Sequence, residues 1–225
     1  MLEYIWFDDE SPILKQIPAE YTSAAILFSP FIQMPEGWEK EKRKNEYEHI
    51  YPNDEEVREK GKAVSWKKVK SSCGFQTNAE LALALMTSIG ALRDECGRED
   101  LAEVLHGNIN EGLFYPSEDH ISNFHISSLV EVFRSNGANQ FYYSEPIIEN
   151  SGFLEITETN LQTVLDDAAA ELMLTDKKMD FVLMSVYDSF ITVFLAKGGN
   201  INELVQRMGW EAMICDEGTH ISWYR

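Results

Sequence analysis

Two histidines and two carboxylates lie within eight residues near the middle of the chain: Glu118, Asp119, His120 and His125. Such side chains bind a metal ion when they converge at about 2.0–2.2 Å, and they also serve in acid–base chemistry. The spacing of five places the two histidines on different faces of a helix, unlike the i, i+4 pair of an HExxH motif. Alternatively, Asp119 or Ser122 caps a helix whose dipole favours nearby carboxylates. We favour the capping interpretation and keep the ligand cluster as a candidate site.

A second candidate pair, Cys215 and His220, lies near the end of the chain. A cysteine beside a histidine suggests a nucleophile and its base. However, Cys215 ends the apolar run 212–214, which predicts a buried thiol that acts as a small hydrophobic group. A site that combines the pair with His120 and His125 requires all four side chains to meet in space, which the sequence does not establish.

The third candidate is Asp188, which interrupts the largely apolar segment Phe181–Ala196. A buried carboxylate has a raised pKa and is suited to general acid or base catalysis. The alternative is a turn residue, since Asp-Ser suits a hairpin corner, although Asp-Gly is the preferred pair for a two-residue turn.

Motifs for nucleic acids and cofactors are lacking. Residues 65–74 followed by a helix from Thr77 match the lengths of a helix-turn-helix, but the second helix has no Lys or Arg up to Met86, which argues against base recognition. Residues 197–200 precede a helix without the spacing of a phosphate-binding loop. We therefore expect no nucleic-acid partner and no cofactor.

Ten of the nineteen basic residues fall between positions 40 and 70, together with or beside Trp38, Tyr47, Tyr51 and Trp66. Aromatic residues beside charges are enriched at interfaces. Seven glutamates are mixed into the same stretch, so a solvated helical face with aromatic anchors is the alternative that we favour.

The first half of the chain reads as mainly helical. The clearest helix begins at Thr77, where Thr77 and Glu80 form a capping box ahead of an apolar stripe. Other segments complete this half: a helix from Ser11-Pro12 to Gln16, a strand over Ala24–Phe28, a charged helix or surface loop over Trp38–His49, helices from Asp54 and Ser65, and a helix over Glu99–His106.

The second half alternates between helices and strands. Phe181–Ala196 predicts two central strands that turn near residues 187–189, with both faces covered. The remaining expectations are helices over Ile121–Ser135, over Leu161–Ala170 and from Asn200, and strands over Gln140–Tyr143, Glu171–Leu174, Ala212–Cys215 and Ile221–Tyr224. These short connections predict an α+β fold with a mainly helical first half followed by a mostly antiparallel sheet with packed helices. We expect a single folding unit over 1–225 with a helical subdomain 1–112 and an α+β subdomain 113–225.

The charge of the chain is strongly negative. With 38 acidic and 19 basic residues, the net charge is −19, of which residues 1–75 carry −3 and residues 76–225 carry −16. Such a field disfavours nucleic acid and anionic membranes and suits a basic protein partner. An acidic start without a basic n-region, no apolar stretch that could span a membrane and three scattered cysteines predict a cytoplasmic protein.

Several segments resemble one family: Phe28–Arg43, Pro116–Ser122, Ser185–Phe190, Trp210–Glu217 and the closing Trp223-Tyr224. The chain is similar along nearly its whole length to uncharacterised proteins of Bacillus and related Firmicutes, grouped as a domain of unknown function. The resemblance implies a bacterial cytoplasmic setting and carries no activity, ligand or catalytic residue.

Two classes of function therefore stay open. One is an acidic interaction protein that binds a basic protein partner, as an immunity protein binds a cationic toxin. The other is an enzyme or metal-binding protein with a site around His120 and His125, joined by Asp119, Cys215 or His220.

Overall fold

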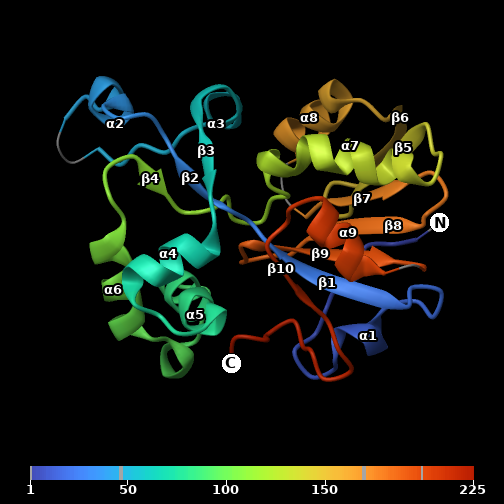
Figure 1. Ribbon diagram of the computed structural model, residues 1–225, viewed down its shortest axis with the longest axis horizontal. Helices are drawn as coiled ribbons and strands as arrows, with labels where there is room; N and C mark the ends of the chain where they lie inside the picture. Colours follow the sequence, from blue (N-terminus) through green and yellow to red (C-terminus); the bar gives the residue numbers. More distant parts are fainter. Residues whose placement is uncertain (1, 46–47, 169–170, 199) are drawn as a thin grey trace. The chain divides into compact units, whose positions relative to one another are not determined.

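The computed structural model describes residues 2–45, 48–168, 171–198 and 200–225, and these form two compact units (Figure 1). Unit 1 contains residues 1–29 and 117–223, and unit 2 contains residues 30–116 and 224–225. The predicted α+β class is confirmed. The expected subdomain limit near residue 112 lies close to the second crossing between the units, whereas residues 1–29 join the later part of the chain because they supply a strand to its sheet.

Unit 1 is built on a seven-stranded antiparallel sheet in the order β10-β1-β9-β8-β7-β5-β6. Its strands are β1 (Ser23–Phe28), β5 (Gln140–Glu145), β6 (Asn150–Glu155), β7 (Met173–Asp176), β8 (Phe181–Ser185), β9 (Ile191–Ala196) and β10 (Ala212–Ile214). Every residue of β8 and β9 is buried, which confirms the predicted central hairpin with both faces covered.

Helices cover one face of this sheet, as Figure 1 shows for α7 (Ile126–Ser135), α8 (Glu158–Asp167) and α9 (Ile201–Arg207). Their apolar sides pack on Phe141, Leu183 and Phe194 in the main core of unit 1. The opposite face carries Ile26, Val193 and Met184, which pair in register and are fully buried. The short helix α1 (Ile13–Gln16) packs against β1.

A buried carboxylate organises the turn between β7 and β8. The side chain of Asp176 is inaccessible to solvent and accepts hydrogen bonds from the main-chain N–H groups of Lys178, Asp180 and Phe181 at 2.8–2.9 Å. Asn136, which ends α7, donates its side-chain amide to the same carboxylate at 2.8 Å. Asp176 thereby joins the end of β7, the start of β8 and the end of α7.

Unit 2 is mainly helical and contains a small antiparallel sheet in the order β3-β2-β4. Capping boxes start two of its helices, at Asn53 with Glu56 and at the predicted Thr77 with Glu80. The elements of this unit are β2 (Phe31–Gln33), α2 (Trp38–Lys42), α3 (Asp54–Lys60), β3 (Lys62–Val64), α4 (Trp66–Cys73), α5 (Asn78–Ser88), η1 (Asp94–Cys96), α6 (Glu99–Asn108) and β4 (Leu113–Phe114).

Several elements differ from the sequence prediction. The segment Ile221–Tyr224 forms turns rather than a strand, since Trp223 packs its ring on Phe28 at 5.3 Å instead of extending the sheet. The helix expected over Ile121–Ser135 begins later, as a 3₁₀ turn η2 (Asn123–His125) followed by α7. Strands β2, β3, β4 and β6 were not predicted. The charged stretch Trp38–His49 is helical only to Lys42.

Parts of three expected segments lie outside the described residues: positions 46–47 of the charged stretch, positions 169–170 at the end of the Leu161–Ala170 helix, and position 199 before α9. Across the described ranges, no helix has the length and apolar character needed to cross a bilayer.

The Asp176 network gives a stability prediction. Replacing Asp176→Ala removes the acceptor of three main-chain N–H groups, of which that of Phe181 is buried, while the Asn136 amide keeps Oδ2 of Asp180 at 2.9 Å. We therefore expect a loss of about 3 kcal/mol in unfolding free energy. The urea midpoint should fall by about 1 M or more. The neighbouring, exposed Lys177→Ala change serves as control and should leave the midpoint nearly unchanged. An Asp176→Ala protein as stable as the Lys177→Ala protein would contradict this account.

Candidate functional site

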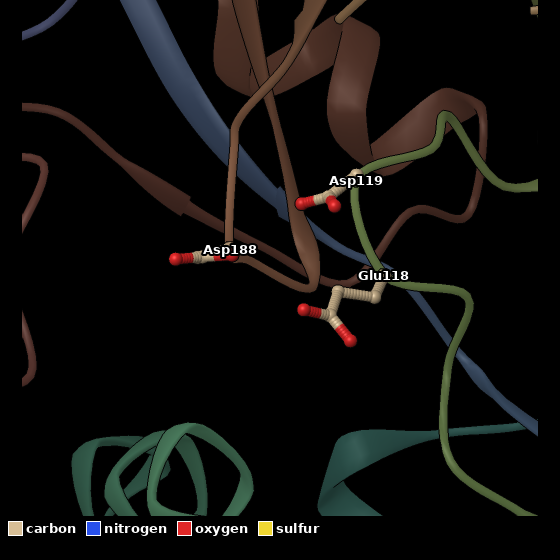
Figure 2. A group of neighbouring side chains, drawn as sticks. All are labelled: Glu118, Asp119 and Asp188. Carbon is tan, nitrogen blue, oxygen red and sulfur yellow. The ribbon is translucent and has the colours of Figure 1, made fainter. Parts of the chain in front are cut away.

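The structure brings three of the candidate residues together in unit 1: Glu118, Asp119 and Asp188. Each offers a carboxylate oxygen, and these oxygens all lie within 4.8 Å of one another. Figure 2 shows Glu118 and Asp119 on the loop that precedes η2, and Asp188 on the turn that joins β8 to β9. All three side chains are half-buried. We call this group the carboxylate cluster.

Main-chain hydrogen bonds hold the loop against the hairpin turn. The N–H of Asp119 donates to the carbonyl oxygen of Ser189 at 2.9 Å, and the N–H of Ser189 donates to Oδ1 of Asp119 at 3.4 Å. Asp119 and Asp188 both adopt left-handed backbone conformations, with φ of 62° and 47°. Aspartate tolerates this region better than most residues because its short polar side chain can hydrogen-bond locally. The loop before η2 and the β8–β9 turn therefore each place an aspartate at the position with the left-handed backbone.

The carboxylates of the cluster repel one another. Burial raises the pKa of Glu118, and the negative charges of Asp119 and Asp188 raise it further. Burial also raises the pKa of Asp119, although hydrogen bonds from the main-chain N–H groups of Ser189 and Asp188 oppose that shift. Within the described part of the chain, no Lys or Arg forms an ion pair with any of the three. A positive charge placed among them would relieve the repulsion.

Carboxylate oxygens are the ligands of hard divalent cations. Ca²⁺ takes six to eight oxygen ligands, and Mg²⁺ keeps several waters and is held by one or two carboxylates. The carboxylate cluster supplies three such groups, so it is an incomplete set for Ca²⁺ and a sufficient protein contribution for a largely hydrated ion. The same three charges also match an ammonium or guanidinium group.

His120 adjoins the carboxylate cluster in sequence, but main-chain oxygens occupy its ring. Its Nδ1 lies 2.6 Å from the carbonyl oxygen of Glu118, and its Nε2 lies 3.3 Å from the carbonyl oxygen of Ala168. These contacts orient the imidazole as a link between the loop and the end of α8. Both ring nitrogens therefore face main-chain oxygens, and a neutral imidazole donates to only one of them.

His125 lies in the hydrophobic core. Its ring packs edge-on against Trp210 at 5.6 Å, and burial lowers its pKa to about 4, so the imidazole is neutral at pH 7. Nε2 has no hydrogen-bond partner among the residues that the structure describes. The capping interpretation is confirmed for Ser122, whose hydroxyl accepts from the N–H of Phe124 at 3.4 Å.

Cys215 and His220 are both in unit 1 but show no common site. Cys215 is buried beyond the end of β10, and burial, with the charge of Asp216, raises the pKa of its thiol to about 12. His220 is held by its Nδ1 contact with the carbonyl oxygen of Asp9 at 3.2 Å. Among the described residues, no group of three or more metal-ligating side chains includes a histidine or a cysteine.

Two tyrosines near the carboxylate cluster were missed by the sequence reasoning. Tyr4 donates its hydroxyl to the carbonyl oxygen of Ser185 at 2.5 Å, and its pKa is raised by burial and by the charges of Glu171 and Asp119. Tyr187 is 63% exposed beside Asp188, and that carboxylate is the first cause of its raised pKa. An isolated tyrosine near the N-terminus gives no sequence signal that it reaches the end of β8, 181 residues away.

A hollow of about 720 Å³ is also present in unit 1, lined by residues 2–5, 16–18, 20 and 179. It contains none of the seven candidate residues. The carboxylate cluster is thus separate from the lining of this hollow.

Comparison with known proteins agrees with the resemblance seen in the sequence. A family model described as a protein of unknown function, DUF2711, matches residues 9–225. The chain belongs to this family. It is 78% identical to the uncharacterized protein YwbB of Bacillus subtilis (strain 168) over 225 residues, which is the full length of both chains. No solved structure matches. DUF2711 membership thus confirms the predicted family and carries no activity.

The raised pKa of Glu118 predicts a pH-dependent stability difference. A carboxylate whose pKa is higher in the folded state stabilises the fold when it is protonated, and this contribution is lost as the pH rises through the folded pKa. Replacing Glu118→Gln should therefore raise Tm at pH 7 by about 1–3 °C, and the difference from wild type should shrink toward pH 4.

Thermal unfolding by circular dichroism between pH 4 and pH 8 measures this difference. The control is Glu217→Gln, which removes one charge from an exposed turn of the same unit and should shift Tm by less than Glu118→Gln does. A lower Tm for Glu118→Gln at pH 7 would show that the carboxylate stabilises the folded protein instead.

The position of Cys215 predicts an unreactive thiol. Because the thiolate is the nucleophile and burial holds the pKa near 12, iodoacetamide at pH 8 should leave Cys215 unmodified in the folded protein and alkylate it in urea. Cys96, which is half-buried, is the internal reference in the same mass spectrum. Alkylation of Cys215 as fast as Cys96 in the folded protein would restore the nucleophile interpretation.

Proposed function

We propose that this protein binds a basic protein partner through unit 1, in the bacterial cytoplasm and in the manner of an immunity protein. The observation that carries the proposal is the distribution of charge between the two units. Unit 1 contains 22 acidic and six basic residues, a net charge of −16, whereas unit 2 contains 16 acidic and 13 basic residues, a net charge of −3.

Charge of this size acts on a partner before contact. A unit of one sign raises the rate of encounter with an oppositely charged protein and disfavours partners of the same sign. Residues 1–29, with five acidic residues and one basic residue, belong to this acidic unit. The basic partner should therefore dock on unit 1.

The carboxylate cluster concentrates this charge at one place. A lysine or arginine of the partner would lie among three oxygens that repel one another, and arginine could pair with a carboxylate through two hydrogen bonds. Tyr187 is exposed beside Asp188 and offers an aromatic face to the same cation. Tyrosine next to a desolvated charge pair is a common energetic centre of an interface.

The alternative is an enzyme or metal-binding protein with a site around His120 and His125 and with Cys215 or His220. Its support is now limited to the carboxylate cluster beside His120. His125 and Cys215 are buried, with pKa values shifted toward their neutral forms.

The proposal predicts a stoichiometric complex that weakens with salt. A tagged copy of the full chain should retain a basic protein from a Bacillus cytoplasmic extract, which mass spectrometry identifies and which is then purified. Titration calorimetry should give a Kd that rises at least about tenfold between 50 and 500 mM NaCl. The triple change Glu118→Gln, Asp119→Asn and Asp188→Asn should weaken binding at least about tenfold at 50 mM NaCl.

A matched triple change in unit 2, namely Asp94→Asn, Glu95→Gln and Glu103→Gln, removes the same charge from exposed side chains and should leave the affinity nearly unchanged. Absence of a stoichiometric partner, or binding that salt does not weaken, would refute the proposal. Stoichiometric binding of Ca²⁺ or Mn²⁺ that the first triple change abolishes would instead favour the metal-binding alternative.

A further inference from the structure

The outer edge of the unit 1 sheet is the strand β6, next to β5 (Figure 1). Its register with β5 fixes which main-chain groups point outward. The N–H of Ile156 donates to the carbonyl oxygen of Asn139 at 3.0 Å, and in an antiparallel pair every second residue bonds to the same neighbour. Asn150, Gly152 and Leu154 therefore face β5, whereas Ser151, Phe153 and Glu155 direct their N–H and C=O groups away from the sheet.

Most of these outward groups are open. The carbonyl oxygen of Glu155 accepts a hydrogen bond from the side chain of Asn160 at 2.9 Å. Within the described ranges, the other five groups, which are the three N–H groups and the carbonyls of Ser151 and Phe153, have no hydrogen-bond partner. All three residues are exposed. Such a row of donors and acceptors is a template for one more strand.

Exposed apolar side chains accompany this edge. Ile147 and Ile148 in the β5–β6 turn are 58% and 53% exposed, and Phe153 is 43% exposed. The ring of Phe153 packs on Tyr142 of β5 at 5.0 Å. We call residues 147–155 the β6 edge. Strand β6 contains no Lys and no Pro, the residues that commonly protect an open edge from pairing.

The opposite edge of the sheet is better protected. Strand β10 is only three residues long, and short edge strands resist pairing. It pairs with β1 at Met213, so Ile214 directs its N–H outward. This difference makes β10 a matched control within the same sheet.

The negative charge of the β6 edge favours a basic strand as its partner. Glu149 and Glu155 are exposed on the β6 edge, and residues 147–155 contain no Lys, Arg or His. Arg134 and Lys177 contact Ile156 and Gln140 at one end of this edge. We propose that the β6 edge takes up an extended, basic segment of the partner as an eighth strand, with apolar residues of that segment covering Phe153. The inference rests on the proposed function and adds a second contact surface of unit 1 for the same partner, besides the carboxylate cluster.

A second copy of the same chain is the less suitable occupant. Pairing two β6 edges would bring the exposed Glu149 and Glu155 of each copy together, with no basic residue among residues 147–155 of either copy. Like charges across a strand pair are destabilising. A segment that alternates basic and apolar residues complements the charges of Glu149 and Glu155 and also covers the exposed ring of Phe153.

The experiment uses the full, ¹⁵N-labelled chain and a capped heptapeptide that alternates lysine and valine, at 50 mM NaCl. Amide exchange should slow at least tenfold at Ser151, Phe153 and Glu155 when the peptide is added. The inward-facing amides of Gly152 and Leu154 should change much less. A peptide with glutamate in place of lysine should have no effect.

Two substitutions locate the binding surface. Phe153→Pro removes an outward N–H without breaking the ladder to β5 and should weaken peptide binding at least tenfold, whereas Ile214→Pro on the β10 edge should bind as the unmodified chain does. If Phe153→Pro does not fold, Phe153→Lys keeps the backbone donor and places a repelling charge at the same position. It should weaken binding to a similar extent.

Peptide binding that is unaffected by these changes, or protection that appears elsewhere in unit 1, would overturn the β6 edge assignment while leaving the basic-partner proposal intact. Failure to bind the lysine peptide at all would also overturn the assignment, and the salt-dependent complex described above would then decide the function alone. Sedimentation velocity measures whether the chain is a monomer or a dimer. A dimer that Phe153→Pro converts to a monomer would show that a second copy occupies the edge.

Discussion

The sheet of unit 1 depends on one buried carboxylate. A carboxylate that is removed from water and lacks a cation is stable only when hydrogen-bond donors fill its lone pairs. Asp176 obtains three main-chain donors from a single turn and a fourth from Asn136 at the end of α7. These bonds set where β8 begins, and β8 in turn carries the hairpin turn that places Asp188 beside Asp119. The candidate site is thus positioned by an interaction that does not touch it.

Local signals allowed much of the fold to be predicted. The Thr77 and Glu80 capping box marks α5 because its hydrogen bonds join residues three apart, and the continuous apolar run of Phe181–Ala196 marks two strands buried on both faces. The edge strand β6 could not be predicted from such local patterns. Asn150–Glu155 has polar residues and a glycine where a strand usually alternates, and it forms β6 because β5 offers a partner. Conversely, Ile221–Tyr224 has the alternating pattern of a strand, yet its backbone forms turns and the ring of Trp223 packs on Phe28.

The candidate site shows a similar division. Every residue of the carboxylate cluster could be named from sequence, since Glu118 and Asp119 are adjacent and Asp188 interrupts an apolar run. Their meeting could not be derived, because it depends on the hydrogen bonds between Asp119 and Ser189, which are seventy residues apart. The burial of His125 against Trp210 and the reach of Tyr4 to Ser185 are also long-range contacts. Residue type indicates which chemistry a side chain can perform, but long-range contacts determine which side chains meet in one site.

The position of β1 has a consequence for synthesis of the chain. This strand emerges from the ribosome early, but its neighbours β9 and β10 are made near the end, so that Ala25 pairs with Phe194 and Ile214. Most of unit 2, residues 30–116, is complete before either neighbour exists. Contacts between such distant segments slow folding, and unpaired apolar strands favour aggregation meanwhile. The nascent chain must therefore keep the apolar segment Ala24–Phe28 unpaired while more than 160 further residues are translated.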